Sequence, residues 1–233
     1  MVWSLDYLYA GLVSLLVGLD RTAVLQLLIS RPIVAAPLTG WVLGDFYLGL
    51  QAGTLLELLW LGRLPVGAAI PPDDTQIAVG GTALALAMGA GAEAEADGLP
   101  MLLLCLLVAL PLGKCGQIFD RLARQGNGRL LIRAEQELAR RRPAAATRWH
   151  LLGLGFFALA SLGTYLGIIL PGSLLLPWLA PYLLAKVGDA APWLALAFPL
   201  VGTAVFLGAL RNRRILVLYL LAFLVVYFLR EGL

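Results

Sequence analysis

Apolar stretches long enough to cross a membrane recur along this chain. A membrane-spanning helix needs about 20 mostly apolar residues. The stretches that meet this requirement are residues 7–29, 99–119, 151–170 and 192–210. Other apolar stretches are short or interrupted by proline and glycine, namely residues 33–61, 76–92, 173–187 and 214–229. The pattern predicts an all-α, polytopic helical membrane protein with re-entrant or broken helices in its N-terminal half.

Composition excludes an ordinary soluble domain. Of the 233 residues, 61% are hydrophobic and 13% are charged, whereas soluble domains are about half apolar and a quarter charged. A chain of this length keeps too much surface in water to hide that excess in a core. Residues 1–233 are therefore expected to form a single membrane domain. The first apolar stretch lacks the basic start and cleavage site of a signal peptide, so we expect it to remain as a span.

Residues 120–150 separate the N-terminal half, residues 1–119, from the C-terminal helices of residues 151–233. They hold eight arginines and three acidic residues. Cytoplasmic loops of membrane proteins concentrate basic residues, so this stretch is predicted to be a cytoplasmic loop. Within it, Gly128 to Arg142 is expected to form a solvated helix ended by Pro143. A patch for nucleic acid or anionic lipid is the less favoured explanation, and we expect no nucleic-acid partner.

Further prolines and arginines extend this topology toward the C-terminus. Residues 171–191 contain three prolines and are predicted to link two spans on the outer side, with an interfacial aromatic belt formed by Trp178, Tyr182 and Trp193. A second arginine cluster at Arg211, Arg213 and Arg214 is expected on the inside. Both basic clusters therefore predict the same orientation of the C-terminal half.

The segment of residues 30–76 breaks the rules for a simple crossing. Pro32 and Pro37, followed by Gly40 and Gly44, predict a half-helix. Discontinuous helices are tolerated in membranes where protein or a wet cavity satisfies the freed backbone groups. Transporters use this device to build binding sites at the membrane midplane. We therefore expect the substrate region here.

Polar residues within this segment give candidate binding groups. Gln51, Thr54 and Glu57 are spaced by three residues and share one helix face. A charged side chain within a span costs about 2.5–3.5 kcal/mol on insertion scales. Glu57 is therefore expected to face a partner or a water-filled cavity, where it could accept hydrogen bonds from substrate hydroxyls. A structural ion pair with Arg31 or Arg63 is the alternative, and both roles are compatible.

A turn with two adjacent carboxylates follows. It reads Pro71-Pro72-Asp73-Asp74-Thr75, between apolar segments. Asp74 or Thr75 could cap the helix that comes next. Two acids exceed what capping requires, so Asp73 and Asp74 are also candidates for substrate binding.

No residue pattern points to chemistry carried out by the chain itself. Cys105 and Cys115 have no metal-type spacing, and His150 is the single histidine. The sequence shows no nucleophile paired with a base, no metal cluster and no glycine-rich nucleotide loop. We expect no catalytic residue, no metal and no cofactor.

Residues 31–73 contain a series of short motifs. In order, they are Arg31-Pro32-Ile33, Gly44-Asp45, Gly53-Thr54-Leu55-Leu56-Glu57, Leu61-Gly62 and Gly67-Ala68-Ala69-Ile70-Pro71-Pro72-Asp73. This series resembles the IIC subunit of the mannose/fructose/sorbose family of the bacterial sugar phosphotransferase system. Outside the N-terminal part, the chain is similar to the family in hydropathy and length alone.

The resemblance implies a permease subunit of the bacterial inner membrane, crossing it several times. Its expected partners are an IID-like membrane subunit and cytoplasmic IIA and IIB phosphocarriers, in an oligomeric complex. The substrate would be a mannose-family hexose, which the partner subunits phosphorylate. Glu57 and Asp73 would contact the sugar, with Gln51, Thr54 and Asp74 beside them.

Three residues would have a structural role, Arg31, Asp45 and Arg63. The alternative functions are a stand-alone secondary transporter, with Glu57 and Asp73 as proton or cation sites, and a non-transporting membrane scaffold or sensor component.

Overall fold

The computed structural model describes residues 5–62, 70–91 and 98–209, together with 217, 218, 221, 222 and 224. Every regular element in this part of the chain is helical. The elements are α1 (Leu5–Thr22), α2 (Pro32–Val42), α3 (Phe46–Leu59), α4 (Asp74–Ala87), α5 (Gly98–Leu112), a 3₁₀ turn (Gly113–Cys115), α6 (Gly116–Ala139) and α7 (Pro143–Ala209). The predicted all-α membrane fold is confirmed.

The predicted break in residues 33–61 is present as two short helices, α2 and α3. With 11 and 14 residues, each is shorter than the roughly 20 residues that a crossing requires. Between them, Gly44 has a φ of 96°, a conformation that side chains disfavour. Asp45 then caps α3 by accepting a hydrogen bond from the Leu48 backbone N–H at 2.9 Å. Local sequence signals therefore end one helix and start the next.

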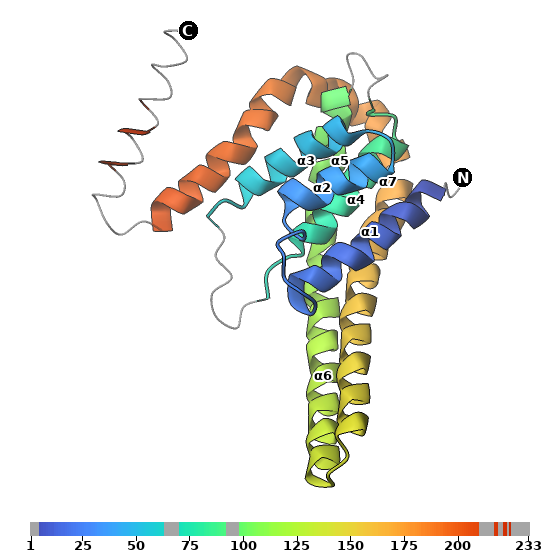
Figure 1. Ribbon diagram of the computed structural model, residues 1–233. Coiled ribbons are helices and arrows are strands. Elements are labelled where there is room, and N and C mark those ends of the chain that lie inside the picture. Colours follow the sequence, from blue (N-terminus) through green and yellow to red (C-terminus); the bar gives the residue numbers. More distant parts are fainter. Residues whose placement is uncertain are drawn as a thin grey trace.

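Glycines let α2 and α3 pack backbone to backbone. A Cβ at Gly49 would collide with the carbonyl oxygen of Ala36 and lie 2.9 Å from the Cα of Pro37. A Cβ at Gly53 would lie 2.6 Å from the carbonyl oxygen of Pro32. Membrane helices associate through such small-residue faces. The α2–α3 pair is therefore a compact unit on the body of the molecule (Figure 1).

Helix α4 lies at the centre of the body. All its residues from Thr75 to Ala85 are buried, and it packs against α1, α2, α3, α5 and α7. Gly80 faces Ile168 of α7, and Gly81 faces Leu106 of α5. The start of α4 is therefore held inside protein rather than at a free surface.

The stretch of residues 120–150, predicted as a loop, is a helical hairpin. Helix α6 continues from α5 through the 3₁₀ turn, and a tight turn at Arg140–Arg142 leads into α7. The chain from Gly116 to Ala139 contains no proline and many strong helix formers, so nothing interrupts it. Figure 1 shows this α6–α7 hairpin projecting from the body as a stalk. The expected helix from Gly128 to Arg142 is thus part of a longer one that already ends at Ala139, and Pro143, which was expected to end it, instead begins α7.

The predicted link of residues 171–191 is also helical. It lies within α7, a helix of 67 residues that contains five prolines, Pro171, Pro177, Pro181, Pro192 and Pro199. Figure 1 shows that α7 runs upward from the stalk, bends over the body and then runs downward. Proline inside a helix removes a hydrogen bond and kinks it. The prolines therefore bend α7 instead of ending it.

Two stretches of the described residues are long and apolar enough to cross a membrane, Gly98–Ala139 and Ala146–Gly208. The side chains of Trp178, Tyr182 and Trp193, all within α7, are exposed. The aromatic belt that the sequence predicts there remains a prediction.

Candidate functional site

The last turn of α1 carries the first polar group of the site. The buried carboxylate of Asp20 accepts hydrogen bonds from the backbone N–H groups of Leu27 at 2.6 Å and Ser30 at 3.1 Å. Leu25, Gln26 and Leu28 have positive φ values, which non-glycine residues rarely adopt. Asp20 therefore stabilises a strained loop whose two ends carry Arg21 and Arg31.

Arg31 pairs with Glu57 where α2 begins and α3 ends. Nε of Arg31 lies 2.9 Å from Oε1 of Glu57, and a second guanidinium nitrogen contacts the same oxygen. The other carboxylate oxygen lies 3.4 Å from the backbone N–H of Ile33. The Glu57 side chain is 18% exposed and that of Arg31 is 50% exposed. Glu57 is therefore paired but still accessible to a ligand.

Arg21 pairs with both acids of the second motif. One guanidinium nitrogen lies 2.7 Å from Oδ2 of Asp73, and another lies 3.4 Å from Oδ1 of Asp74. Asp73 also caps α4, because its other oxygen accepts the Gln76 backbone N–H at 3.0 Å. The residue that caps α4 is therefore Asp73, and not Asp74 or Thr75 as the sequence suggested.

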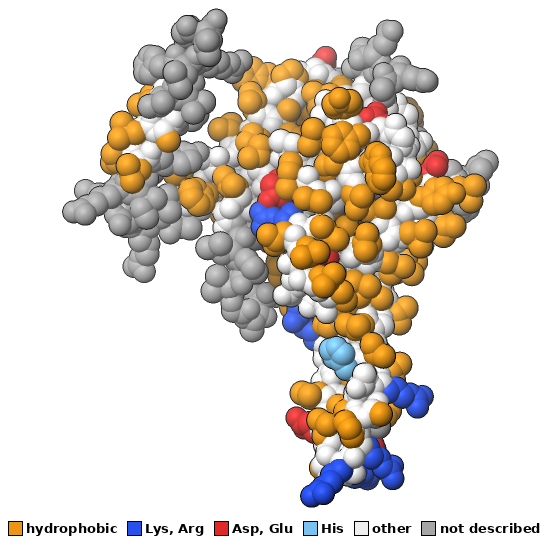
Figure 2. All heavy atoms as spheres, in the orientation of Figure 1, with side chains coloured by type: hydrophobic (Ala, Val, Ile, Leu, Met, Phe, Trp, Pro, Cys, Tyr) orange, Lys and Arg blue, Asp and Glu red, His pale blue; other side chains and the backbone are white. Residues whose placement is uncertain are grey.

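The two arginine–carboxylate pairs belong to one polar region. Thr75 of α4 donates its hydroxyl to the backbone carbonyl of Ser30, next to Arg31. We call Arg21, Arg31, Glu57, Asp73 and Asp74 the paired-acid site. Figure 2 shows acidic and basic side chains side by side within the otherwise apolar surface of the body.

The remaining predicted residues lie around this site without joining its ion pairs. Gln51 and Thr54 are exposed on α3, and the Thr54 hydroxyl donates to the Leu50 carbonyl of its own helix. Asp45 caps α3, and among the described residues it forms no ion pair. Arg63 lies outside the described residues.

Asp20 and Arg21 were not identified from the sequence as parts of the site. Both lie within the apolar stretch of residues 7–29, and ionisable residues in such stretches commonly mark functional sites. Gln76 was likewise not identified, and its buried amide donates to the Ser14 carbonyl at 3.1 Å. Within the described chain, the Gln76 side-chain oxygen and the Ser14 hydroxyl have no hydrogen-bond partner. A polar region thus extends from Asp73 into the core.

The side chains of the site can both accept and donate hydrogen bonds. Carboxylate oxygens accept hydrogen bonds, and arginine nitrogens donate them. A hydroxyl-rich ligand both donates and accepts, so it matches this mixed set. Among the described residues, no group of three or more histidine, cysteine or acidic side chains is placed to hold a metal ion.

Comparison with known proteins places the chain in a family. The family model described as the PTS system sorbose-specific IIC component matches residues 4–232. The putative N-acetylgalactosamine permease IIC component 2 of Escherichia coli (strain K12) is 40% identical over 75 residues, which cover 32% of this chain and 56% of that protein. The sorbose-specific EIIC component of Klebsiella pneumoniae is 31% identical over 94 residues, covering 40% of this chain and 32% of that protein. The chain therefore matches about half or less of the length of these relatives.

Solved structures share the fold. One of them, described as a membrane protein, matches with a TM-score of 0.79 and 21% sequence identity. The match covers 98% of this chain and 88% of the chain in that structure. A chain from the structure of the mannose transporter ManYZ in complex with microcin E492 matches with a TM-score of 0.61 and 20% sequence identity. That match covers 97% of this chain and 88% of the other chain. Because the family model spans nearly every residue, the chain belongs to the family of sorbose-specific IIC components of the phosphotransferase system.

Proposed function

We propose that this chain is the sugar-translocating membrane subunit of a phosphoenolpyruvate-dependent phosphotransferase system. The observation that carries the proposal is Glu57, a carboxylate in a mostly apolar helix that is held by Arg31 at a helix break and remains partly exposed. A carboxylate in this position can accept hydrogen bonds from sugar hydroxyls without facing lipid. The substrate class is a mannose-family hexose, in line with the mannose, sorbose and fructose specificities named for relatives.

The proposed binding groups are the acids of the paired-acid site and their polar neighbours on α3. Arg21 orients Asp73 and Asp74, while Gln51 and Thr54 supply an exposed amide and hydroxyl near Glu57. Arginine pairing fixes each carboxylate in one geometry and leaves lone pairs for the ligand. Sugar binding would therefore use Glu57 and Asp73 as main acceptors.

Phosphoryl transfer is assigned to partner subunits. Phosphocarriers use a nucleophile, usually histidine or cysteine, and His150 lies on the stalk rather than in the paired-acid site. The family resemblance supplies the partners, namely an IID-like membrane subunit and the IIA and IIB carriers. The complex would reside in the bacterial inner membrane, which this chain crosses several times.

Reconstitution distinguishes this function from the alternatives. The chain and a candidate IID subunit are inserted into proteoliposomes, and labelled hexose uptake is measured with and without phosphorylated IIA and IIB. We expect uptake that requires the phosphate donors and accumulates sugar phosphate. Uptake driven by an ion gradient without donors would overturn the proposal in favour of a secondary transporter. Absence of uptake from a complex that assembles normally would favour a scaffold.

A further inference from the structure

We propose that a pocket at the base of the α6–α7 hairpin binds an anionic phospholipid. The pocket has a volume of about 480 Å³ and lies between the hairpin and the end of α1. That volume falls within the range typical of small-molecule sites. Nothing in the proposed sugar function uses this pocket, so the two proposals stand independently.

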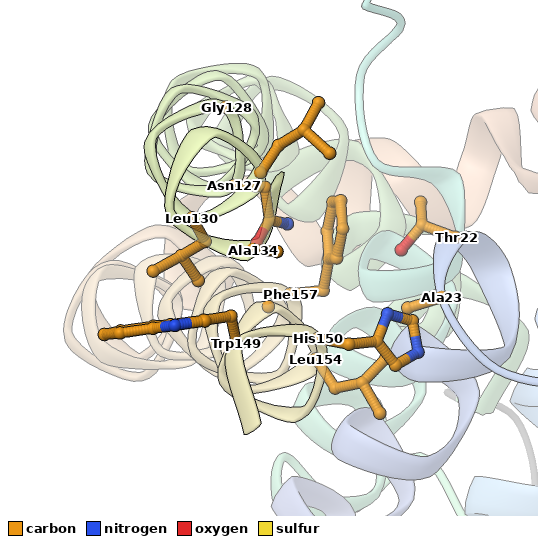
Figure 3. A pocket seen from close by; sticks show the side chains of 12 residues that line it. Thr22, Ala23, Asn127, Gly128, Leu130, Ala134, Trp149, His150, Leu154 and Phe157 are labelled. Carbon is orange, nitrogen blue, oxygen red and sulfur yellow. The ribbon is translucent and has the colours of Figure 1, made fainter. Parts of the chain in front are cut away.

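Apolar side chains make up much of the pocket wall, among them Leu130 of α6 and Leu154 and Phe157 of α7. Trp149 and His150 lie one to two turns nearer the tip of the hairpin, and Asn127 adds a polar group beside Phe157 (Figure 3). An acyl chain fits the first group, because burial of apolar surface stabilises its binding. Tryptophan and histidine combine an apolar ring with a polar tip, which suits the boundary between acyl chains and headgroups.

The hairpin that carries the pocket has an excess of positive charge, and Arg129 and Arg133 line a neighbouring groove on it. Residues 120–150 hold eight arginines and three acidic residues, an excess of five positive charges. Two of these arginines pair with acids of the same helix, Arg124 with Asp120 and Arg140 with Glu137. Among the described residues, Arg129, Arg133 and Arg148 form no ion pair. These arginines are available to an anionic headgroup.

One arginine of the neighbouring groove contacts a residue of the pocket wall. The guanidinium carbon of Arg133 lies 5.3 Å from the centre of the Trp149 ring, and that ring lines the pocket. A cation over a tryptophan face is held in place by the ring's electrons. Arginine binds phosphate through its planar array of N–H donors. Arg133 is thus held beside the Trp149 wall of the pocket, which is where the proposal places the phosphate.

The surface of the hairpin favours a lipid over a soluble anion or an acidic protein. Large apolar side chains are exposed between the arginines, including Leu131 at 60% and Ile132 at 57%. Figure 2 shows apolar and basic side chains interleaved along the stalk. Interfacial helices that bind anionic membranes combine these two features, and the cytoplasmic leaflet supplies the negative headgroups. The hairpin base is therefore suited to the membrane boundary.

Lipid retention measured by native mass spectrometry tests the site. The purified full chain is exchanged into detergent micelles that contain either phosphatidylglycerol or phosphatidylcholine, and retained lipid is counted. We expect preferential retention of phosphatidylglycerol. Each of the substitutions Arg129→Gln, Arg133→Gln and Arg148→Gln should weaken retention about fivefold, the equivalent of about 1 kcal/mol for each basic residue near a charged surface.

Matched controls separate the pocket from general charge. Arg140→Gln removes the same charge from an arginine already paired with Glu137, so retention should change less than twofold. Ala134→Trp fills the pocket and should abolish retention, whereas Ala139→Trp places the same ring on the exposed end of α6. Circular dichroism and gel filtration check that each variant folds.

Three outcomes would overturn the proposal. Equal retention of the two lipids would show that headgroup charge plays no role. Displacement of the lipid by inorganic phosphate alone would indicate a soluble anion site. An acidic polypeptide that co-purifies with the parent chain and is lost from the arginine variants, with lipid retention unchanged, would indicate a protein partner.

Discussion

The hydroxyl of Thr75 donates a hydrogen bond to the backbone carbonyl of Ser30 at 2.8 Å, across 45 positions of sequence. This bond joins the start of α4, which carries Asp73 and Asp74, to the loop that carries Arg31. It therefore couples the two arginine–carboxylate pairs of the paired-acid site.

Thr75→Val should destabilise the protein. The substitution keeps the shape of the side chain but leaves the Ser30 carbonyl without its donor, a loss of ~1 kcal/mol. Thermal unfolding in detergent measures the change. Thr147→Val is the matched control, because the exposed Thr147 hydroxyl donates to the Pro143 carbonyl of its own helix. Equal shifts in the two variants would show that the cross-chain bond contributes nothing.

Gly49→Ala should lower the stability of the protein by disturbing the packing of α2 against α3. The added methyl group would collide with the carbonyl oxygen of Ala36, and such overpacking costs about 1–3 kcal/mol. Gly155→Ala serves as the control, because a Cβ there meets no atom within 4 Å. That control should be neutral or slightly stabilising, since alanine favours helix over glycine. A Gly49 variant as stable as the control would contradict the close packing.

Glu57→Gln should lower sugar uptake by ~10-fold or more, because a hydrogen bond to a charged group contributes about 1.5–3 kcal/mol. Uptake is measured in the reconstituted system, and insertion and complex formation are checked in the same preparation. Glu137→Gln removes an acid from an exposed pair on the stalk and should leave uptake unchanged. Normal uptake by the Glu57 variant would remove this residue from the binding site.

Arg21→Gln should cost roughly 3 kcal/mol of stability, because it leaves the buried Asp73 without its cation. The double variant Arg21→Gln/Asp73→Asn should recover part of the loss, since no unpaired charge then remains. Arg124→Gln breaks a pair whose arginine is largely exposed and should cost no more than ~1 kcal/mol. Additive losses in the double variant would contradict a direct interaction.

Several features of the fold followed from local sequence signals. Long apolar runs predicted a helical membrane protein because lipid leaves few alternatives for the backbone. Pro32 begins α2 and Gly44 lies between α2 and α3, so these two residues act locally as the prediction of a half-helix requires, whereas Pro37 lies inside α2 without ending it. Local signals misled at residues 171–191, where prolines bend α7 without ending it. A proline removes one hydrogen bond, and the surrounding packing decides whether the helix continues.

The sequence by itself also supplied Glu57 and Asp73, because acids within apolar surroundings need partners wherever the chain places them. Only the tertiary structure decided which partners these are. Glu57 lies 26 positions from Arg31, and Asp73 lies far along the chain from Arg21. Such pairs depend on how α1, α2, α3 and α4 pack, and no local pattern encodes that packing. Tertiary structure likewise left Gln51 and Thr54 exposed outside the ion pairs, because a shared helix face does not specify what that face meets.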